Sequence, residues 1–299
     1  MRDLIGHTPL VNINYAFEQV EGVKLFAKLE YYNPSGSVKD RTGLYMVEDA
    51  IKDGRLKRGS TIVEATAGNT GLGVAFAALN QGFHVIFVVP EKFSEEKQIL
   101  MKALGADIIH TKREDGMLGA AAKAQELLSE IKDSISLQQF KNMSNPKAHY
   151  ETTGPEIYQE LDGKIDYLVA GAGSGGTYSG VVKFLKEQNP NIKGILADPV
   201  GSTMGGGEHA DYDIEGIGND FIADTMDMSL VDKVIKINDS QSFDGARALA
   251  RHEGILGGSS TGAAFSAALK LIYEHHVKGN IVFIAPDRGD RYFSKHLYA

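Results

Sequence analysis

Residues 62–90 read IVEATAGNTGLGVAFAALNQGFHVIFVVP, and their pattern predicts the fold class. An apolar run at residues 62–64 is followed by a loop of small residues and then by a longer stretch, residues 71–81, that ends at Gly82. A glycine in that place is typical of a helix C-terminus. Another apolar run occupies residues 84–89. The stretch therefore predicts a strand, a helix and a strand in succession, which implies parallel strands joined by a right-handed crossover.

The same alternation of short apolar runs and longer amphipathic stretches continues along the chain. A polar segment, residues 138–146, separates two halves that both show it, and we place a domain crossing there. We therefore expect an α/β fold of two three-layer α/β domains with mainly parallel sheets. In chain order, the other expected elements are helix 44–51, helix 95–104, strand 107–110, helix 117–132, strand 166–170, helix 177–188, strand 192–198, helix 242–252, helix 263–276 and strand 280–285.

The composition excludes several classes of function. The chain of 299 residues has no cysteine, which excludes disulfides, thiolate zinc sites, iron–sulfur clusters and a cysteine nucleophile, and we expect no metal site. A formal net charge of −8 disfavours non-specific attraction to nucleic acid or to anionic lipid. No apolar run approaches the roughly 20 residues of a membrane helix, and the first residues do not resemble a signal peptide. We expect a cytoplasmic protein that binds small molecules, with no nucleic acid and no membrane as partner.

Three loops of small residues precede expected helices, at residues 64–71, 171–177 and 257–262. The free N–H groups at a helix N-terminus and the helix dipole favour an anionic group such as a carboxylate or a phosphate. Three such loops at the carboxyl ends of parallel strands would surround one crevice. Two structural alternatives stay open: Asn69 could be a plain N-cap in the first loop, and the third loop could be a tight turn that permits close packing.

The second loop, residues 171–177, is the best phosphate site of the three. Its glycines let the backbone close on a ligand, and the hydroxyls of Ser174 and Thr177 can add donors. It also fits the dinucleotide pattern G-x-G-x-x-G, with Asp198 22 residues after Gly176 at the end of the next expected strand. An NAD-dependent dehydrogenase is therefore an alternative from another class. That alternative leaves the other two loops without a role.

One lysine stands in an unusual place for a surface charge. Lys39 follows the turn-forming residues 33–37, at the expected start of a helix. A solvated surface lysine is the common case, but cations are disfavoured at a helix N-terminus, and a neighbouring phosphate or an imine linkage would relieve that cost. An amine, a phosphate loop and a carboxylate site together suggest pyridoxal 5′-phosphate as cofactor.

Several segments together resemble the cysteine synthase and cystathionine β-synthase family, which uses pyridoxal phosphate and has the tryptophan synthase β fold type. The match is collinear from residue 5 to nearly the C-terminus, so it is more specific than any single loop, and it displaces the dehydrogenase alternative. One departure is Ala67, where most relatives have serine, and we assign that residue no side-chain role. The matching segments are residues 34–41, 66–71, 139–140, 152–157 and 173–177 together with Ser260.

The resemblance implies a role for each matching residue. Lys39 would be the catalytic residue, holding the cofactor as an imine and, once displaced by substrate, taking the α-proton. Asn69 would bind the pyridine ring oxygen, and Ser260 would hydrogen-bond the pyridine nitrogen. The cofactor phosphate would be bound by Gly173, Ser174, Gly175, Gly176 and Thr177. The substrate carboxylate would be bound by Thr66, Gly68, Asn69, Thr70 and Gln139.

The hydroxyl of Ser260 carries information about the reaction. An aspartate would keep the pyridine nitrogen protonated, whereas a hydroxyl can donate to an unprotonated nitrogen and leaves the ring a weaker electron sink. A weaker sink suits a substrate that expels its β-substituent promptly. The implied reaction is β-replacement, in which O-acetylserine or serine loses its leaving group to give an aminoacrylate, and a thiol or sulfide then adds.

The resemblance also implies an arrangement of domains. Residues 1–34 and 145–299 would form a larger cofactor-binding domain, and residues 35–144 a smaller mobile domain with the substrate loop. The cofactor would lie in the crevice between them, and the protein would be a homodimer. Because the chain ends at Ala299, we expect neither the C-terminal regulatory domain nor the N-terminal haem segment of some larger cystathionine β-synthases.

Three segments favour homocysteine over sulfide as the acceptor. Residues 145–153, 215–221 and 286–287 resemble cystathionine β-synthases rather than cysteine synthases. Within them, Tyr150 and Asp220 are candidates to bind homocysteine, the phenol by a hydrogen bond and the acid by pairing with the ammonium group. We therefore expect cystathionine synthesis of the bacterial O-acetylserine-dependent kind, as in reverse transsulfuration. A cysteine synthase that uses sulfide is the alternative, and a diaminopropionate-forming relative is a third.

Overall fold

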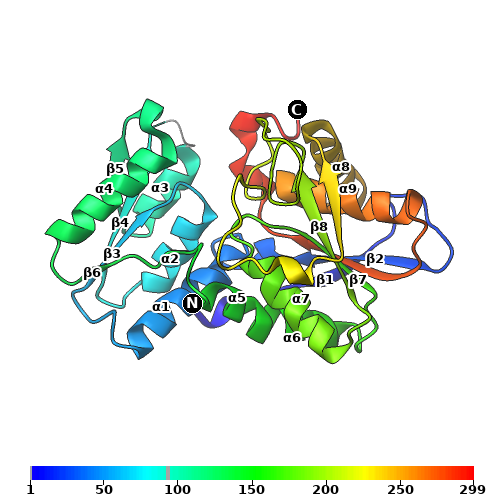
Figure 1. The fold of residues 1–299 in the computed structure, drawn as a ribbon, viewed down its shortest axis with the longest axis horizontal. Coiled ribbons are helices and arrows are strands. Elements are labelled where there is room, and N and C mark those ends of the chain that lie inside the picture. Colours follow the sequence, from blue (N-terminus) through cyan, green and yellow to red (C-terminus); the bar gives the residue numbers. More distant parts are fainter. Residues whose placement is uncertain (1, 92–94) are drawn as a thin grey trace. The chain divides into compact units, whose positions relative to one another are not determined.

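The computed structural model describes residues 2–91 and 95–299, which divide into two compact units. The first unit comprises Met1–Ile5 and Lys39–Asn145, and the second comprises Gly6–Val38 and Pro146–Ala299. Each unit has its own mainly parallel sheet with helices on both faces (Figure 1). The predicted α/β class with mainly parallel sheets is confirmed. The division into a cofactor domain and a substrate-loop domain stays a prediction.

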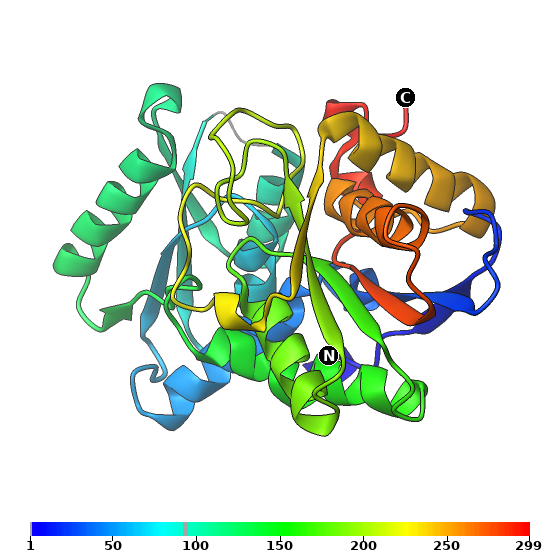
Figure 2. The ribbon, with the colours of Figure 1, turned by 45° about the vertical axis from the view of Figure 1, so that its right-hand side comes forward.

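The sheet of the first unit has four parallel strands in the order β5-β4-β3-β6. Helix α4 covers one face, and α1, α2 and α3 pack on the other. Figure 2 shows α4 apart from α2 and α3 with the strands between them. The elements are α1 (Lys39–Lys52), β3 (Thr61–Ala65), α2 (Asn69–Ala78), β4 (His84–Pro90), α3 (Glu95–Ala103), β5 (Asp107–Thr111), α4 (Gly116–Glu130) and β6 (Ser134–Ile135).

Neighbouring residues of β3 show why its sequence is continuously apolar. Ile62 packs with α1, α2 and α3, whereas Val63 packs with α4, and both side chains are fully buried. Successive side chains of a strand point to opposite faces, so a strand covered on both faces needs apolar residues throughout. The predicted strand–helix–strand unit of residues 62–90 is therefore confirmed with shifts of one to three residues at its ends.

The sheet of the second unit has six strands in the order β1-β2-β10-β7-β8-β9, all parallel except the β1–β2 pair. Helices α8 and α9 cover one face, and α6 and α7 cover the other (Figure 1). The strands are β1 (Leu10–Ile13), β2 (Val23–Leu29), β7 (Tyr167–Gly171), β8 (Lys193–Pro199), β9 (Lys233–Ile237) and β10 (Gly279–Ala285). The helices are α6 (Gly154–Glu160), α7 (Gly176–Gln188), α8 (Asp239–Glu253) and α9 (Ser259–Tyr273), and the short α5 (Ser144–Ala148) spans the point of division.

Strands β1, β2, β6 and β9 were not predicted. In β2, lysine is the reason. Lys28 interrupts the apolar pattern of β2, yet its side chain is 0% exposed. Its ammonium group donates to the carbonyl oxygen of Thr8 at 2.7 Å and pairs with Glu156 and Glu160, each at 3.0 Å. A buried cation is tolerated when it is paired in this way, and partners so distant in sequence leave no local pattern.

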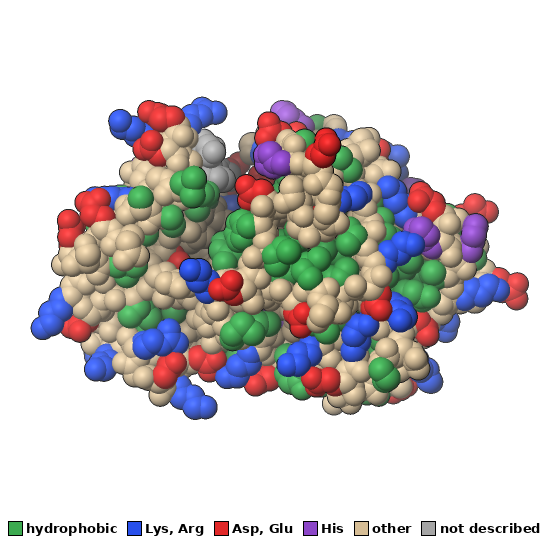
Figure 3. Space-filling view, in the orientation of Figure 1, with side chains coloured by type: hydrophobic (Ala, Val, Ile, Leu, Met, Phe, Trp, Pro, Cys, Tyr) green, Lys and Arg blue, Asp and Glu red, His purple; other side chains and the backbone are tan. Residues whose placement is uncertain are grey.

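The surface mixes both signs of charge. Figure 3 shows lysine and arginine interspersed with aspartate and glutamate over the face in view. Within residues 2–91 and 95–299, the structure has no helix long and apolar enough to cross a membrane.

Helices α1 and α2 approach each other backbone to backbone at a pair of glycines. A Cβ atom built on Gly43 would lie 2.7 Å from the backbone nitrogen of Val74, and one on Gly73 would lie 2.6 Å from the carbonyl carbon of Lys39. Real Cβ contacts are not this short, so the two positions require glycine. The contact fixes the first residue of α1, which is Lys39, against α2.

We predict that Gly73→Ala lowers the free energy of unfolding by about 1–3 kcal/mol, because the added methyl group must push the helices apart. Urea denaturation of the apoprotein measures the change. Gly68→Ala is the control, because a Cβ there has open space and φ is −119°. It should lower the free energy of unfolding by clearly less than Gly73→Ala. Equal costs for the two variants would contradict the prediction.

Candidate active site

The three small-residue loops lead into helices α2, α7 and α9, and all three helices have glycine N-caps. These are Gly68, Gly175 and Gly258, and none of the three helix starts has a side-chain cap. Helix α8, by contrast, begins with a complete capping box at Asn238. The first-turn N–H groups of α2, α7 and α9 thus lack the usual side-chain acceptor and suit an anionic ligand. The alternative that Asn69 is an N-cap is wrong, because Asn69 is already in the helix.

In the first unit, the structure brings Thr70 and Gln139 together. The Thr70 hydroxyl donates to Oε1 of Gln139 at 2.6 Å, although 69 residues separate them. The backbone oxygen of Gln139 accepts from Nδ2 of Asn145 at 2.9 Å. Thr66, Gly68 and Asn69 lie in the same loop and first helical turn as Thr70. The predicted carboxylate site is therefore one local cluster, and its ligand role stays a prediction.

Glu64, which the sequence analysis passed over, anchors this cluster. Its carboxylate is at the end of β3 and accepts from the backbone N–H of Gln138 at 2.9 Å and from the Ser136 hydroxyl at 3.0 Å. It also accepts from the backbone N–H of Leu137. Burial raises the pKa of Glu64, and these hydrogen bonds oppose the rise. Glu64 thus holds the backbone just before Gln139 beside the loop that carries Thr70.

Lys39 is the first residue of α1, as expected from the sequence. Lys39 is at the helix end where the dipole is positive, and the next two residues, Asp40 and Arg41, are buried. The position fits an amine that is to be held in an imine linkage.

In the second unit, the glycine loop between β7 and α7 requires its glycines. Gly175 has a left-handed φ of 83°, and a Cβ on Gly173 would lie 2.5 Å from the backbone oxygen of Gly216. The carbonyl oxygen of Gly173 accepts from Nδ2 of Asn219 at 2.6 Å, and that of Ser174 accepts from the Thr225 hydroxyl at 2.5 Å. Protein donors thus hold the loop carbonyls, which leaves the amide end of α7 to an anion. This donor set fits a phosphate group.

Ser260 is buried in the first turn of α9. The C-terminal segment holds the three residues in front of that helix: the N–H of Gly289 donates to Leu256, the Tyr298 hydroxyl donates to Gly257, and the carbonyl of Asp287 accepts from Gly258. The bonds from Gly289 and Gly258 measure 2.8 and 3.0 Å.

Ser259, beside Ser260, is a second hydroxyl that sequence reasoning missed. Its Oγ accepts from the backbone N–H of Glu215 at 3.0 Å, so its own proton remains available to a ligand. The sequence offered no signal to separate the two serines, because both lie in the same run of small residues.

Asp287 has a structural position rather than an open one. It is 2% exposed, and its carboxylate accepts from the Tyr292 hydroxyl. Burial, together with the charge of Asp287, raises the pKa of Tyr292 well above its ordinary value. Asp287, one of the residues that resemble cystathionine β-synthases, therefore shapes the turn before Ser260. It does not offer a free charge to a substrate.

The two candidates for the acceptor site are placed differently. Asp220 is exposed and directly follows Asn219, which binds the glycine loop. The Tyr150 hydroxyl instead donates to Glu187 at 2.5 Å, near the C-terminal end of α7. At 1.5 Å per residue, Glu187 is about 15 Å along the helix from Thr177. The structure thus brings Asp220, but not Tyr150, to the phosphate loop, and this placement gives Tyr150 no support as a substrate ligand.

Asp198, the acid of the dehydrogenase alternative, is engaged elsewhere. Its carboxylate pairs with Lys236 at 2.5 Å and accepts from the N–H of Gly205 at 3.0 Å, and the residue is 1% exposed. A ribose-binding acid must reach its ligand, so the buried and paired carboxylate of Asp198 contradicts the alternative.

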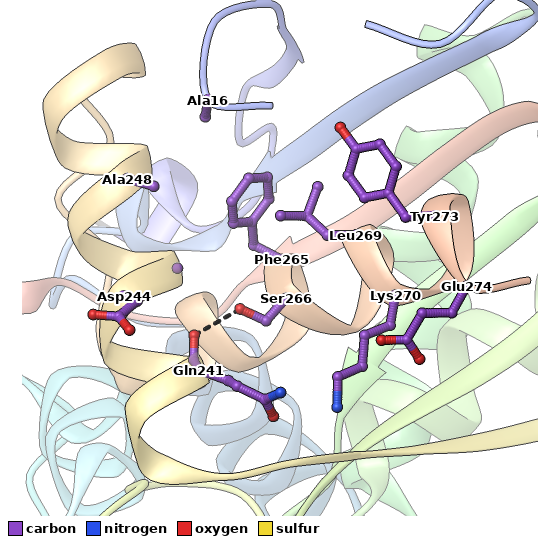
Figure 4. Close-up of a pocket in the computed structure, with 11 residues that line it drawn as sticks. Ala16, Gln241, Asp244, Ala248, Phe265, Ser266, Leu269, Lys270, Tyr273 and Glu274 are labelled. Carbon is purple, nitrogen blue, oxygen red and sulfur yellow. Dashed lines mark hydrogen bonds between the residues drawn. The ribbon is translucent and has the colours of Figure 1, made fainter. Parts of the chain in front are cut away.

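A separate pocket lies between α8 and α9 (Figure 4). It has a volume of about 440 Å³, with the aromatic rings of Phe265 and Tyr273 and the side chain of Leu269 on its wall. The dashed bond in Figure 4 joins the Ser266 hydroxyl to the backbone oxygen of Gln241 at 2.7 Å. None of the predicted site residues lines this pocket.

The chain is similar to known proteins over almost its whole length. Residues 1–287 match the family model described as "Pyridoxal-phosphate dependent enzyme". An "O-acetylserine dependent cystathionine beta-synthase" from Bacillus subtilis is 50% identical over 296 residues, which cover 99% of this chain and 96% of that protein. A "Cysteine synthase" from Helicobacter pylori is 44% identical and covers 100% of this chain and 98% of its own. The crystal structure of an O-acetylserine dependent cystathionine beta-synthase from Helicobacter pylori matches with a TM-score of 0.93 at 44% identity, covering 100% of this chain and 98% of that chain.

The raised pKa of Glu64 predicts a pH-dependent effect on stability. The folded chain holds the Glu64 proton at pH values where the unfolded chain has lost it, so the stabilisation is fully present below the ordinary pKa of 4.5 and is lost as pH rises through the raised pKa. Relative to Glu64→Gln, the free energy of unfolding of the wild type should therefore fall by about 1.4 kcal/mol for each unit by which folding raises the pKa of Glu64. Urea denaturation between pH 4 and 7 measures this. The exposed Glu126→Gln is the control, and a wild type that gains on Glu64→Gln with rising pH would refute the prediction.

Proposed function

The chain belongs to the family of pyridoxal-phosphate-dependent enzymes, and on that premise we propose that it catalyses β-replacement on O-acetylserine with homocysteine. The bond between the β-carbon and the ester oxygen of O-acetylserine breaks, and a bond between the β-carbon and the sulfur of homocysteine forms. Cystathionine and acetate are the products. The observation that carries the proposal is 50% identity across 99% of the chain with a relative of that printed activity. The loops described above support it, since they supply sites for one phosphate and one carboxylate.

The proposed cofactor residues fit the group. Pyridoxal phosphate supplies, when bound, an electron sink for the bonds at the substrate α-carbon. The loop of Gly173–Thr177 at the start of α7 would bind its phosphate, and Ser260 would donate to its ring nitrogen. Lys39 would hold it covalently and then accept the substrate α-proton on its amine. Asn69 would bind its ring oxygen.

The first unit would bind the amino-acid substrate. The N–H groups at the start of α2 and the side chains of Thr66, Thr70 and Gln139 offer donors to a carboxylate. Glu64 keeps Gln139 at the loop through three hydrogen bonds to the residues before it. This pre-arrangement orients the substrate and lowers the entropic cost of reaching the reactive geometry.

A cysteine synthase is the second candidate function, supported by the Helicobacter pylori relative at 44% identity. The two candidates share the loss of acetate and differ only in whether sulfide or homocysteine adds. Among the segments that favoured homocysteine, Asp287 is buried and Tyr150 binds Glu187, which leaves Asp220 to carry the distinction. The homodimer and the cytoplasmic location also stay predictions.

We predict that Lys39→Ala abolishes the covalent attachment of the cofactor and lowers turnover at least a thousandfold, because no amine remains to take the α-proton. Mass spectrometry after borohydride reduction measures the attachment, and acetate release measures turnover. Lys52→Ala, at the other end of the same helix, is the control. An active Lys39→Ala enzyme would refute the assignment of Lys39.

We predict that Asp220→Gly raises the KM for homocysteine about tenfold, the equivalent of 1.4 kcal/mol, because the ammonium group of homocysteine loses its counter-charge. The rate of acetate release and the KM for sulfide should not change. Asp224→Gly, also exposed in the same loop, is the matched control. Equal losses with both acceptors would mean that Asp220 shapes the loop, and the assignment would revert to cysteine synthase.

A further inference from the structure

His149 lies beside the phosphate loop and has no role in the function proposed above. It is 0% exposed and begins a single turn of π-helix, His149–Thr153. π-Helical turns are rare in proteins, and those that occur are frequently at functional sites. The ring lies between two hydroxyls: Nδ1 is 3.0 Å from Oγ1 of Thr153, and Nε2 is 3.1 Å from Oγ1 of Thr177.

Gly180 allows this close approach. It lies on α7 one turn after Thr177, and a Cβ built there would lie 2.8 Å from Cβ of His149 and 2.9 Å from the backbone nitrogen of Tyr150. Any larger residue would force the π-turn away from the helix. The contact between His149 and Thr177 is therefore built into the packing of α7.

The hydroxyl of Thr153 decides which ring nitrogen carries the proton. Thr153 is 0% exposed, and in the part of the chain that the structure describes its hydroxyl has His149 as its one partner. If Nδ1 carried the proton, the Thr153 proton would be buried without an acceptor, which folded proteins avoid. The Thr153 O–H therefore donates to Nδ1, and the proton of the neutral ring is on Nε2.

The direction of the next bond follows. The N–H at Nε2 donates to Oγ1 of Thr177, so the Thr177 hydroxyl proton cannot point back at the ring. Thr177 is half-buried in the first turn of α7, beside Gly175 and Gly176. Its proton is thus directed to an acceptor other than His149.

We propose that His149 is a positioning residue that aims the Thr177 O–H at the cofactor phosphate, in a chain of hydrogen bonds that runs from Thr153 through His149 to Thr177. This inference rests on the proposed assignment of Gly173–Thr177 to that phosphate. His149 does not touch the cofactor in this scheme. It sets the direction of a donor that does.

The first test is the tautomer of the ring. Long-range ¹H–¹⁵N spectra of the ¹⁵N-labelled holoenzyme, with the His149 signals assigned by their loss in His149→Gln, should show a protonated Nε2 and an unprotonated Nδ1. A ring protonated on Nδ1 would overturn the proposal. The same spectrum of the apoprotein gives the answer without any assumption about the cofactor.

The second test compares two amide substitutes for the ring. The Gln amide can place an N–H near the position of Nε2, whereas the shorter Asn amide reaches only the position of Nδ1. His149→Gln should keep the ³¹P shift of the bound cofactor and its dissociation rate within twofold of wild type. His149→Asn should move the ³¹P shift and raise the dissociation rate at least tenfold. Thermal unfolding of both apoproteins corrects for lost packing.

Equal effects of the two variants would show that the ring merely fills space and would overturn the proposal. No amino-acid substrate is present in either test, so an error in the proposed acceptor leaves both results unchanged. A ³¹P shift that neither variant moves would show that Thr177 does not donate to the phosphate, which also overturns the proposal. If neither variant folds, the tautomer of the wild type decides.

Discussion

The backbone N–H groups of a helix's first turn have no partner within the helix, and most of this structure depends on how three helices meet that constraint. Helices α2, α7 and α9 begin at glycines without side-chain caps, whereas α8 has a full capping box. In the loop before α7, glycine lets neighbouring backbone come close, as Gly216 does at Gly173. The chain thus leaves donors open at the three helix ends that are assigned to ligands, whereas the capping box of α8 occupies the corresponding donors there.

Those open ends are held in place by residues distant in sequence. Glu64 binds the backbone of residues 137–138, and the segment 287–298 binds the backbone of residues 256–258. Asn219 and Thr225 bind the carbonyl oxygens of the glycine loop. Each tether uses a buried or partly buried donor or acceptor, which keeps the loop geometry fixed before any ligand arrives. Preorganised donors of this kind do not have to reorient during a reaction.

Local pattern predicted the parallel-sheet fold and the three loops, because a buried strand, a glycine and a helix are adjacent in sequence. It placed the start of α9 at residue 263 rather than Ser259, since the small residues of the first turn resemble a loop. It missed β2, where the acidic partners of Lys28 are more than a hundred residues away. Glu64 and His149 were missed for the same reason, as their bonds span 72 and 28 residues. Tyr150 was predicted to bind homocysteine because its segment resembles cystathionine β-synthases. In the structure that segment packs on α7, and the Tyr150 hydroxyl donates to Glu187.

The proposed reaction joins homocysteine to the β-carbon of O-acetylserine. The most direct measurement is to supply the purified enzyme with O-acetylserine and equal concentrations of sulfide and homocysteine, and to quantify both products by mass spectrometry. We predict that cystathionine exceeds cysteine. Cysteine as the dominant product would contradict this prediction and would identify the chain as a cysteine synthase.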